Sequence, residues 1–372
     1  MIATVRLLAP GRLALLFALA LYARLYVGSV EPAAGWNPKA AAAYLDARAE
    51  WWTTWPNAQR DRGTYCMSCH TTLPYALARP ALRGLLNERA PSAAEEKIVG
   101  NLLTRARSWR DVEPWYPDQT RGIPKTSESR AIEAVMNAAV LSRRDALTGK
   151  LSDDTRTAFS VMWNLQMKTG PEAGAWTWLN FKMEPWESPN SPYFGAAIAA
   201  IAIGSAPEGY ATSPDIADRV KALQGYFQRQ HAGVSLLNQL MALWASHRMP
   251  GLLTTEQRKN TIDAALALQQ PDGGWNTASI GSYTRSDSTK TDIRTDGFAT
   301  ALATLALQSA GLPATDSRVA RGLDWLRKNQ DPESGRWTAV SPNKERDPKT
   351  EPSKFMSDAA TAYAVLSLTY QP

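Results

Sequence analysis

A short turn sequence that recurs along the chain restricts its fold more than any other feature. Residues 269–275 read QQPDGGW and residues 330–337 read QDPESGRW, so each joins a glutamine to a glycine and a tryptophan. Weaker copies lie at 166–176, with a longer insert, and at 59–65, where tyrosine replaces tryptophan. A unit that returns at such a spacing is typical of architectures that stack one supersecondary element many times.

Each strong turn separates two kinds of segment. An amphipathic stretch precedes it, and a segment of small apolar residues follows it, as at 193–203, 297–307 and 360–368. A helix that is apolar nearly all round is buried, whereas an amphipathic one covers a surface. We therefore expect six pairs of an outer and an inner helix, which begin near residues 42, 94, 153, 214, 256 and 316. Arranged in a ring, they form an all-α (α/α)6 toroid, a single domain over residues 36–372.

The repeats resemble the QW motifs of the squalene-hopene cyclase and prenyltransferase toroid superfamily. The resemblance rests on residues 321–337, which include Arg321, Gly322 and Trp325, and on residues 269–275. It implies an (α/α)6 barrel around a central cavity, which in the cyclases accommodates a long isoprenoid. The cyclases that protonate an alkene use a D-x-D-D string, and this sequence contains none. The resemblance therefore implies the fold and an apolar ligand, with terpenoid cyclisation the less favoured activity.

The only two cysteines lie in one pentapeptide, Cys66-Met67-Ser68-Cys69-His70. C-x-x-C-H is the attachment signature of haem c, in which both thiols bond the porphyrin and the histidine binds the iron. A disulfide between the cysteines and a zinc site are the alternatives, although few other zinc ligands are present. The pentapeptide and the residues after it look like those of exported cyclase-like proteins that pair this motif with QW repeats. We expect covalent haem c at Cys66 and Cys69, with His70 as iron ligand, on the rim where the first hairpin turns inward.

Residues 1–30 are typical of an export segment. Arg6 and Arg12 precede the apolar run 13–23, and Arg24 interrupts it. The run suits a secretory signal peptide, and when it is extended across Arg24 it is long enough for an N-terminal membrane anchor. Either predicts a periplasmic protein, soluble or tethered to the inner membrane. The net charge of +6 over 372 residues has no basic block behind it and gives no indication of nucleic-acid binding.

Several further side chains are candidates for the cavity. Met136 is the candidate sixth haem ligand, because it falls on the adjacent inner helix, and Met162, Met167 and Met183 of the next unit are the alternatives. The candidate catalytic carboxylates are Glu133, Asp292, Asp296 and Asp358, although an aspartate at a helix start is first expected to cap that helix. Arg294 beside Asp292 and Asp296 predicts an ion pair at the rim. Aromatic walls are expected from Tyr193, Phe194, Phe298 and Tyr363.

Two functions from different classes agree with these features. The first is an exported haem c protein that passes electrons to, or oxidises, an apolar or isoprenoid molecule in the central cavity, with a redox partner. The second is a haem-free isoprenoid or lipid binder, or a divergent terpenoid cyclase, in which Cys66 and Cys69 form a disulfide. Covalent haem distinguishes the two.

Overall fold

The computed structural model describes residues 35–281 and 283–371. The export segment predicted at residues 1–30 lies outside these residues. Within them, no helix combines the length and the apolar character needed to cross a membrane.

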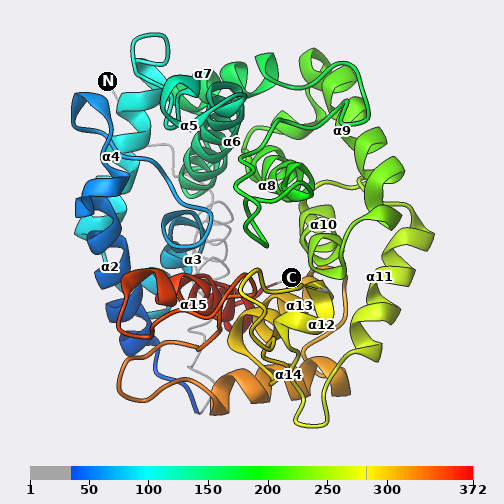
Figure 1. Cartoon of the computed structure of the whole chain (residues 1–372). Helices are drawn as coiled ribbons and strands as arrows, with labels where there is room; N and C mark the ends of the chain where they lie inside the picture. Colours follow the sequence, from blue (N-terminus) through cyan, green and yellow to red (C-terminus); the bar gives the residue numbers. More distant parts are fainter. Residues whose placement is uncertain (1–34, 282, 372) are drawn as a thin grey trace, which may run out of the picture. The chain divides into compact units, whose positions relative to one another are not determined.

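The described part of the chain folds into helical hairpins (Figure 1). The outer helices are α2 (Pro38–Thr54), α4 (Ala93–Arg107), α7 (Asp153–Asn164), α9 (Ala217–Gln230), α11 (Thr255–Ala267) and α14 (Ser317–Lys328). The inner helices are α3 (Thr72–Leu85), α6 (Lys125–Ala146), α8 (Ser191–Ser205), α10 (Leu236–Arg248), α13 (Gly297–Ser309) and α15 (Phe355–Leu368). Two short helices, α5 (Asp118–Arg121) and α12 (Thr277–Gly281), lie in connections. Only isolated bridges, and no strands, occur in the residues described.

The inner helices close into a ring. Each contacts the next in the order α3, α6, α8, α10, α13, α15, and α15 contacts α3 again (Figure 1). Small residues permit this packing: every residue of α13 is buried, and α8 is buried along nearly its whole length. Outer helices bury one stripe instead, as α14 does with Val319, Gly322, Leu323 and Leu326. The predicted all-α toroid of six hairpins is confirmed.

The repeated turns fasten neighbouring hairpins together. The indole Nε1 of Trp337 donates to the carbonyl of Leu326, at the end of its own outer helix, at 2.7 Å. Gln330 donates through Nε2 to the carbonyls of Gly335 (2.8 Å) and Asn37 (3.0 Å), and its Oε1 accepts from the Asn37 N–H at 2.6 Å. Asn37 caps α2, so this turn joins the last hairpin to the first.

The turns at Trp275 and Trp176 make the same contacts with the hairpin that follows each of them. Gln269 reaches the Arg318 carbonyl of α14 at 2.8 Å, and Gln166 reaches the Arg219 carbonyl of α9 at 3.0 Å. The glutamine of the repeat is thus a link between turn and neighbouring outer helix.

The connections differ between the two ends of the hairpins. Those that lead from an outer to an inner helix include the long stretches 55–71, 108–124, 165–190, 268–296 and 329–354, whereas those that return are short. Because the hairpins are arranged in parallel around the ring, the long connections gather on one rim. The C-x-x-C-H motif belongs to this rim.

Candidate functional site

His70 lines a cavity of about 500 Å³ on the long-connection rim, which we call the His70 cavity. Its walls come from the end of α2, the start of α15 and the connections 108–124, 165–190 and 329–354. Six aromatic residues contribute to the wall: Trp52, Trp55, Tyr116, Phe181, Trp186 and Phe355. The volume falls in the range of small-molecule sites.

The His70 ring is held between aromatic side chains of the first and last hairpins. It stacks on Phe355, with ring centroids 3.8 Å apart and planes inclined by 19°. The Trp52 ring stands edge-to-face to it, with ring centroids 5.1 Å apart. Burial, together with the positive charges of Arg48 and Arg346, lowers the pKa of His70 to about 3. The imidazole is therefore neutral, as a metal-binding histidine must be.

A chain of hydrogen bonds fixes which nitrogen of His70 carries the proton. Thr71 Oγ1 lies 2.9 Å from His70 Nδ1 and donates its own proton to Asp358 Oδ2 at 2.7 Å. A hydroxyl has one proton to give, so Nδ1 must be the donor to Thr71. Nε2, which forms no hydrogen bond within the described residues, is left with its lone pair free.

Asp358 is the acceptor at the end of this series of hydrogen bonds. It is 1% exposed and also accepts from the Tyr44 hydroxyl at 2.7 Å and from Arg48 Nε at 2.8 Å. Burial raises the pKa of Asp358, whereas the charge and hydrogen bond of Arg48 act in the opposite direction. Three donors aimed at its two oxygens are all satisfied by the carboxylate form. Asp358, expected to be a cavity carboxylate, instead orients His70 through Thr71.

Cys66 and Cys69 are free, buried thiols that do not themselves line the His70 cavity. They are 1% and 2% exposed, and burial raises the pKa of both. Tyr116, which hydrogen bonds the Cys66 thiol, and Glu187, whose negative charge acts on both thiols, line the His70 cavity. Burial also raises the pKa of Glu187 to about 7. The main chain here is fixed, since Trp52 Nε1 donates to the Cys66 carbonyl at 2.7 Å.

These residues fit a haem c group. The site offers one neutral histidine nitrogen, aromatic side chains that could face a macrocycle, and two buried thiols whose neighbours Tyr116 and Glu187 line the same cavity. Two guanidinium groups, those of Arg121 and Arg346, also line the cavity and suit anionic propionates. No group of three or more His, Cys, Asp or Glu side chains in the described residues is placed to bind a metal ion on its own.

The structure does not bring Met136 to this cavity. It is fully buried on α6 and does not line the wall. Two other thioethers do, Met183 and Met356. Met183, in the connection 165–190, was among the further methionines that the sequence offered as sixth ligand, whereas Met356, at the start of α15, was not considered.

The other candidate carboxylates have local roles elsewhere. Glu133 is fully buried and pairs with Arg105 of α4, whose Nε lies 2.5 Å from its Oε1. Asp292 forms the expected rim ion pair with Arg294 at 2.5 Å. Asp296 caps α13 by accepting from the Phe298 and Ala299 N–H groups. None of the three lines the His70 cavity.

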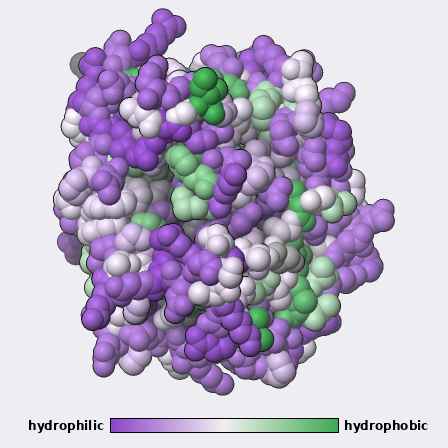
Figure 2. Space-filling view, viewed as in Figure 1, coloured by the Kyte–Doolittle hydropathy of each residue, from purple (hydrophilic) through white to green (hydrophobic). Residues whose placement is uncertain are grey.

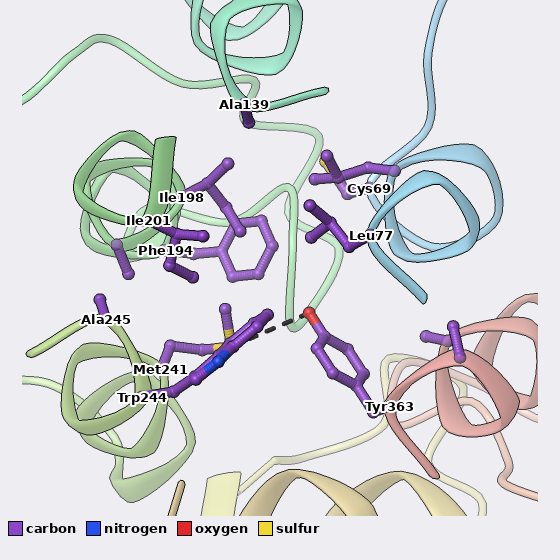
Figure 3. Packing of buried hydrophobic residues seen from close by; sticks show 14 of the residues in the cluster. Cys69, Leu77, Ala139, Phe194, Ile198, Ile201, Met241, Trp244, Ala245 and Tyr363 are labelled. Carbon is purple, nitrogen blue, oxygen red and sulfur yellow. Dashed lines mark hydrogen bonds between the residues drawn. The ribbon is translucent and has the colours of Figure 1, made fainter. Parts of the chain in front are cut away.

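Figure 3 shows the middle of the ring, where side chains from several inner helices converge. Phe194 of α8 and Tyr363 of α15 point there, and the Tyr363 hydroxyl donates to Met241 Sδ of α10 at 3.9 Å. Tyr193 packs against Tyr226 and Phe227 of outer helix α9 instead, and its hydroxyl bonds His231. The predicted aromatic walls thus divide between the ring interior and the space between helix layers.

Sequence reasoning missed the residues that complete the site. Thr71 follows the motif directly, and a hydroxyl next to a candidate ligand is a signal that was available. Phe355 and Arg346 gave no signal, because their proximity to His70 depends on the ring closing, and the approach of Trp52 depends on how the connection 55–71 folds back onto α2.

One comparison with known protein families matches part of the chain. Residues 236–364 match the family model described as the squalene-hopene cyclase C-terminal domain, a range that runs from α10 to within α15 and leaves out the C-x-x-C-H motif. No curated protein matches the chain significantly. Among solved structures, the chain is similar to the ent-copalyl diphosphate synthase from Streptomyces platensis, with 14% sequence identity, a TM-score of 0.32, and coverage of 89% of this chain and 50% of that chain. This chain thus spans about half of that protein's length.

Proposed function

We propose that this toroid protein is an exported haem c protein in which Cys66 and Cys69 hold the haem and His70 Nε2 binds its iron. The observation that carries the proposal is the hydrogen-bonded chain from His70 Nδ1 through Thr71 to Asp358, which leaves Nε2 free at a cavity. Metal-binding histidines are commonly held in this way by a carboxylate behind them. Haem, when bound, supplies one-electron chemistry.

The chain's own residues would orient and enclose the group. Phe355 and Trp52 keep the His70 ring in place, while Arg121 and Arg346 supply positive charge for the propionates. The aromatic wall excludes water and offers contact to an apolar or isoprenoid molecule. Electron transfer to such a molecule or its oxidation, with a redox partner outside, is the activity that we propose.

The sixth iron ligand decides between these two activities. A thioether there favours electron transfer, and an open position favours chemistry on a small molecule. Met183 and Met356 line the cavity. Replacing both with leucine tests this: an unchanged visible spectrum means that neither methionine is a ligand.

The direct test is expression of the full chain with a haem c maturation system. We expect a mass increase of one haem that survives denaturation, and a Soret band. Cys66→Ser/Cys69→Ser must lose the covalent mass. His70→Ala should keep the mass but change the spectrum, while His247→Ala, on the exposed end of α10, should change neither.

Wild-type protein without added mass under these conditions would overturn the proposal. The haem-free isoprenoid or lipid binder, with Cys66 and Cys69 oxidised, would then take its place. Cell fractionation tests export separately: we expect the protein in the periplasm or on the inner membrane, and recovery from the cytoplasm would contradict this.

A further inference from the structure

A second cavity on the same rim is strongly basic. It has a volume of about 650 Å³ and is formed by the connections 285–294 and 336–354 with the start of α15. Its lining contains seven cationic side chains, Arg285, Lys290, Arg294, Arg336, Lys344, Arg346 and Lys354, and only two acidic ones, Asp292 and Glu345. We call it the basic cavity. In Figure 2, hydrophilic residues predominate over the lower left of the molecule, where Figure 1 places the connection 329–354.

Most of these cations have no carboxylate partner. Arg294 pairs with Asp292 and Lys354 with Glu351, but the described residues place no carboxylate within ion-pair distance of the other five. Like charges gathered in one concavity repel each other, and a counter-charge lowers the free energy of such an arrangement. The described residues therefore do not supply enough negative charge to balance the basic cavity.

Some polar groups of the lining are already used within the protein. Arg285 donates from Nη1 to the Lys290 carbonyl at 3.0 Å and from Nη2 to the Ser341 carbonyl at 3.1 Å. The hydroxyls of Ser353 and Ser357 donate to backbone carbonyls and have no further proton to give. The cations that form neither an ion pair nor a side-chain hydrogen bond within the described residues stay available to a ligand: Lys290, Arg336, Lys344 and Arg346.

We propose that the basic cavity binds a small polyanion with phosphate-type oxygens, either free in solution or as the headgroup of a lipid. Guanidinium groups match such oxygens in charge and in geometry, since they donate in a planar fork. The shape favours a small ligand over an acidic protein, because protein partners dock on broad surfaces of about 800 Å² per side. Ser341 and Arg346 line both cavities, so the polyanion would bind beside the contents of the His70 cavity.

Binding of pyrophosphate to the full-length protein, measured by calorimetry at low ionic strength, tests the free anion. We expect saturable binding that weakens as salt is raised. Lys290→Gln/Lys344→Gln, which alters two exposed loop residues, should weaken it about tenfold. The matched control Lys39→Gln/Lys221→Gln removes the same charge from α2 and α9, outside the cavity, and should leave affinity within about twofold.

Sedimentation with phosphatidylglycerol vesicles, compared with phosphatidylcholine vesicles, tests the headgroup. Binding to the anionic vesicles that is lost in Lys290→Gln/Lys344→Gln, without pyrophosphate binding, identifies a lipid source. Arg336→Gln should weaken whichever ligand binds. If neither probe binds, or if the cavity variant and the control bind equally well, the proposal is wrong. Neither measurement depends on haem.

Discussion

The turn at 330–337 and the turn at 59–65 occupy the same place in the last and the first hairpin, yet they use their residues differently. In the last turn, Gln330 reaches out to Asn37 of the next hairpin. In the first, Gln59 bonds back to the Thr53 carbonyl of its own hairpin at 2.8 Å. The contact between the first turn and the next outer helix comes from that helix instead: Asn101 of α4 accepts from the Tyr65 N–H and donates to the Tyr65 carbonyl.

The two glycines show the same contrast. A Cβ on Gly335 would lie 2.4 Å from the backbone of Ala40, whereas one on Gly63 would meet nothing within 4 Å. The last turn is pressed against its neighbour, and the first is not. The first hairpin is therefore joined to its neighbour through Asn101 and not through a close turn.

The largest expected difference concerns the aromatic residues. Trp337→Ala removes a fully buried indole that packs on Trp36 and bonds Leu326, and should lower the free energy of unfolding by about 3–5 kcal/mol. Tyr65→Phe removes only a buried hydroxyl that has no partner in the described residues, and should change stability by less than about 0.5 kcal/mol. Urea unfolding of both variants measures this. A comparable loss in Tyr65→Phe would mean that the Tyr65 hydroxyl fastens the first turn as the Trp337 indole fastens the last.

The glycines give a matched pair. Gly335→Ala and Gly63→Ala share the strain of a positive φ, +76° and +67° respectively. Only the first also forces two backbones apart, so it should destabilise by about 3 kcal/mol more. The comparison is read from the difference between the two denaturation midpoints, and equal midpoints would refute a tighter last turn.

Thr71→Val tests the His70 site separately from the contacts of the repeated turns. It leaves His70 Nδ1 and Asp358 Oδ2 without their shared partner, and should reduce stability by about 1–3 kcal/mol. Covalent haem should still form, since both thiols remain, but the reduction potential should shift because His70 is no longer held by the carboxylate. Thr71→Ser restores the hydroxyl and should restore the potential. A potential that is the same in all three proteins would show that the hydrogen-bonded chain does not act on the iron.

The glutamines give the smallest effect. Gln330→Ala should lower the free energy of unfolding by about 1 kcal/mol and loosen the start of α2, because the turn loses its bonds to Asn37. Hydrogen exchange at residues 39–42 should rise in this variant and stay unchanged in Gln59→Ala. Faster exchange in both would remove the distinction between the turns.

The sequence predicts the fold well because the repeat is local: a glutamine, a glycine and a tryptophan within one turn mark each strong hairpin. It predicts His70 and the cysteines for the same reason. It could not predict that Asp358 serves His70, since 287 residues separate Thr71 from Asp358 and no periodicity relates them. Met136 was placed by helix order alone, and side-chain direction puts Met183 and Met356 at the cavity instead.

The closure of the ring sets an order of events for the nascent chain. Cys66, Cys69 and His70 emerge early, but Phe355, which stacks on His70, and Asp358, which accepts from Thr71, belong to α15, about 290 residues further along the chain. Contacts between such distant segments form late, because a long loop must first close. Until then Cys66 and Cys69, which are 1% and 2% exposed in the finished fold, lie in an incomplete ring, so the proposed attachment of haem would precede ring closure.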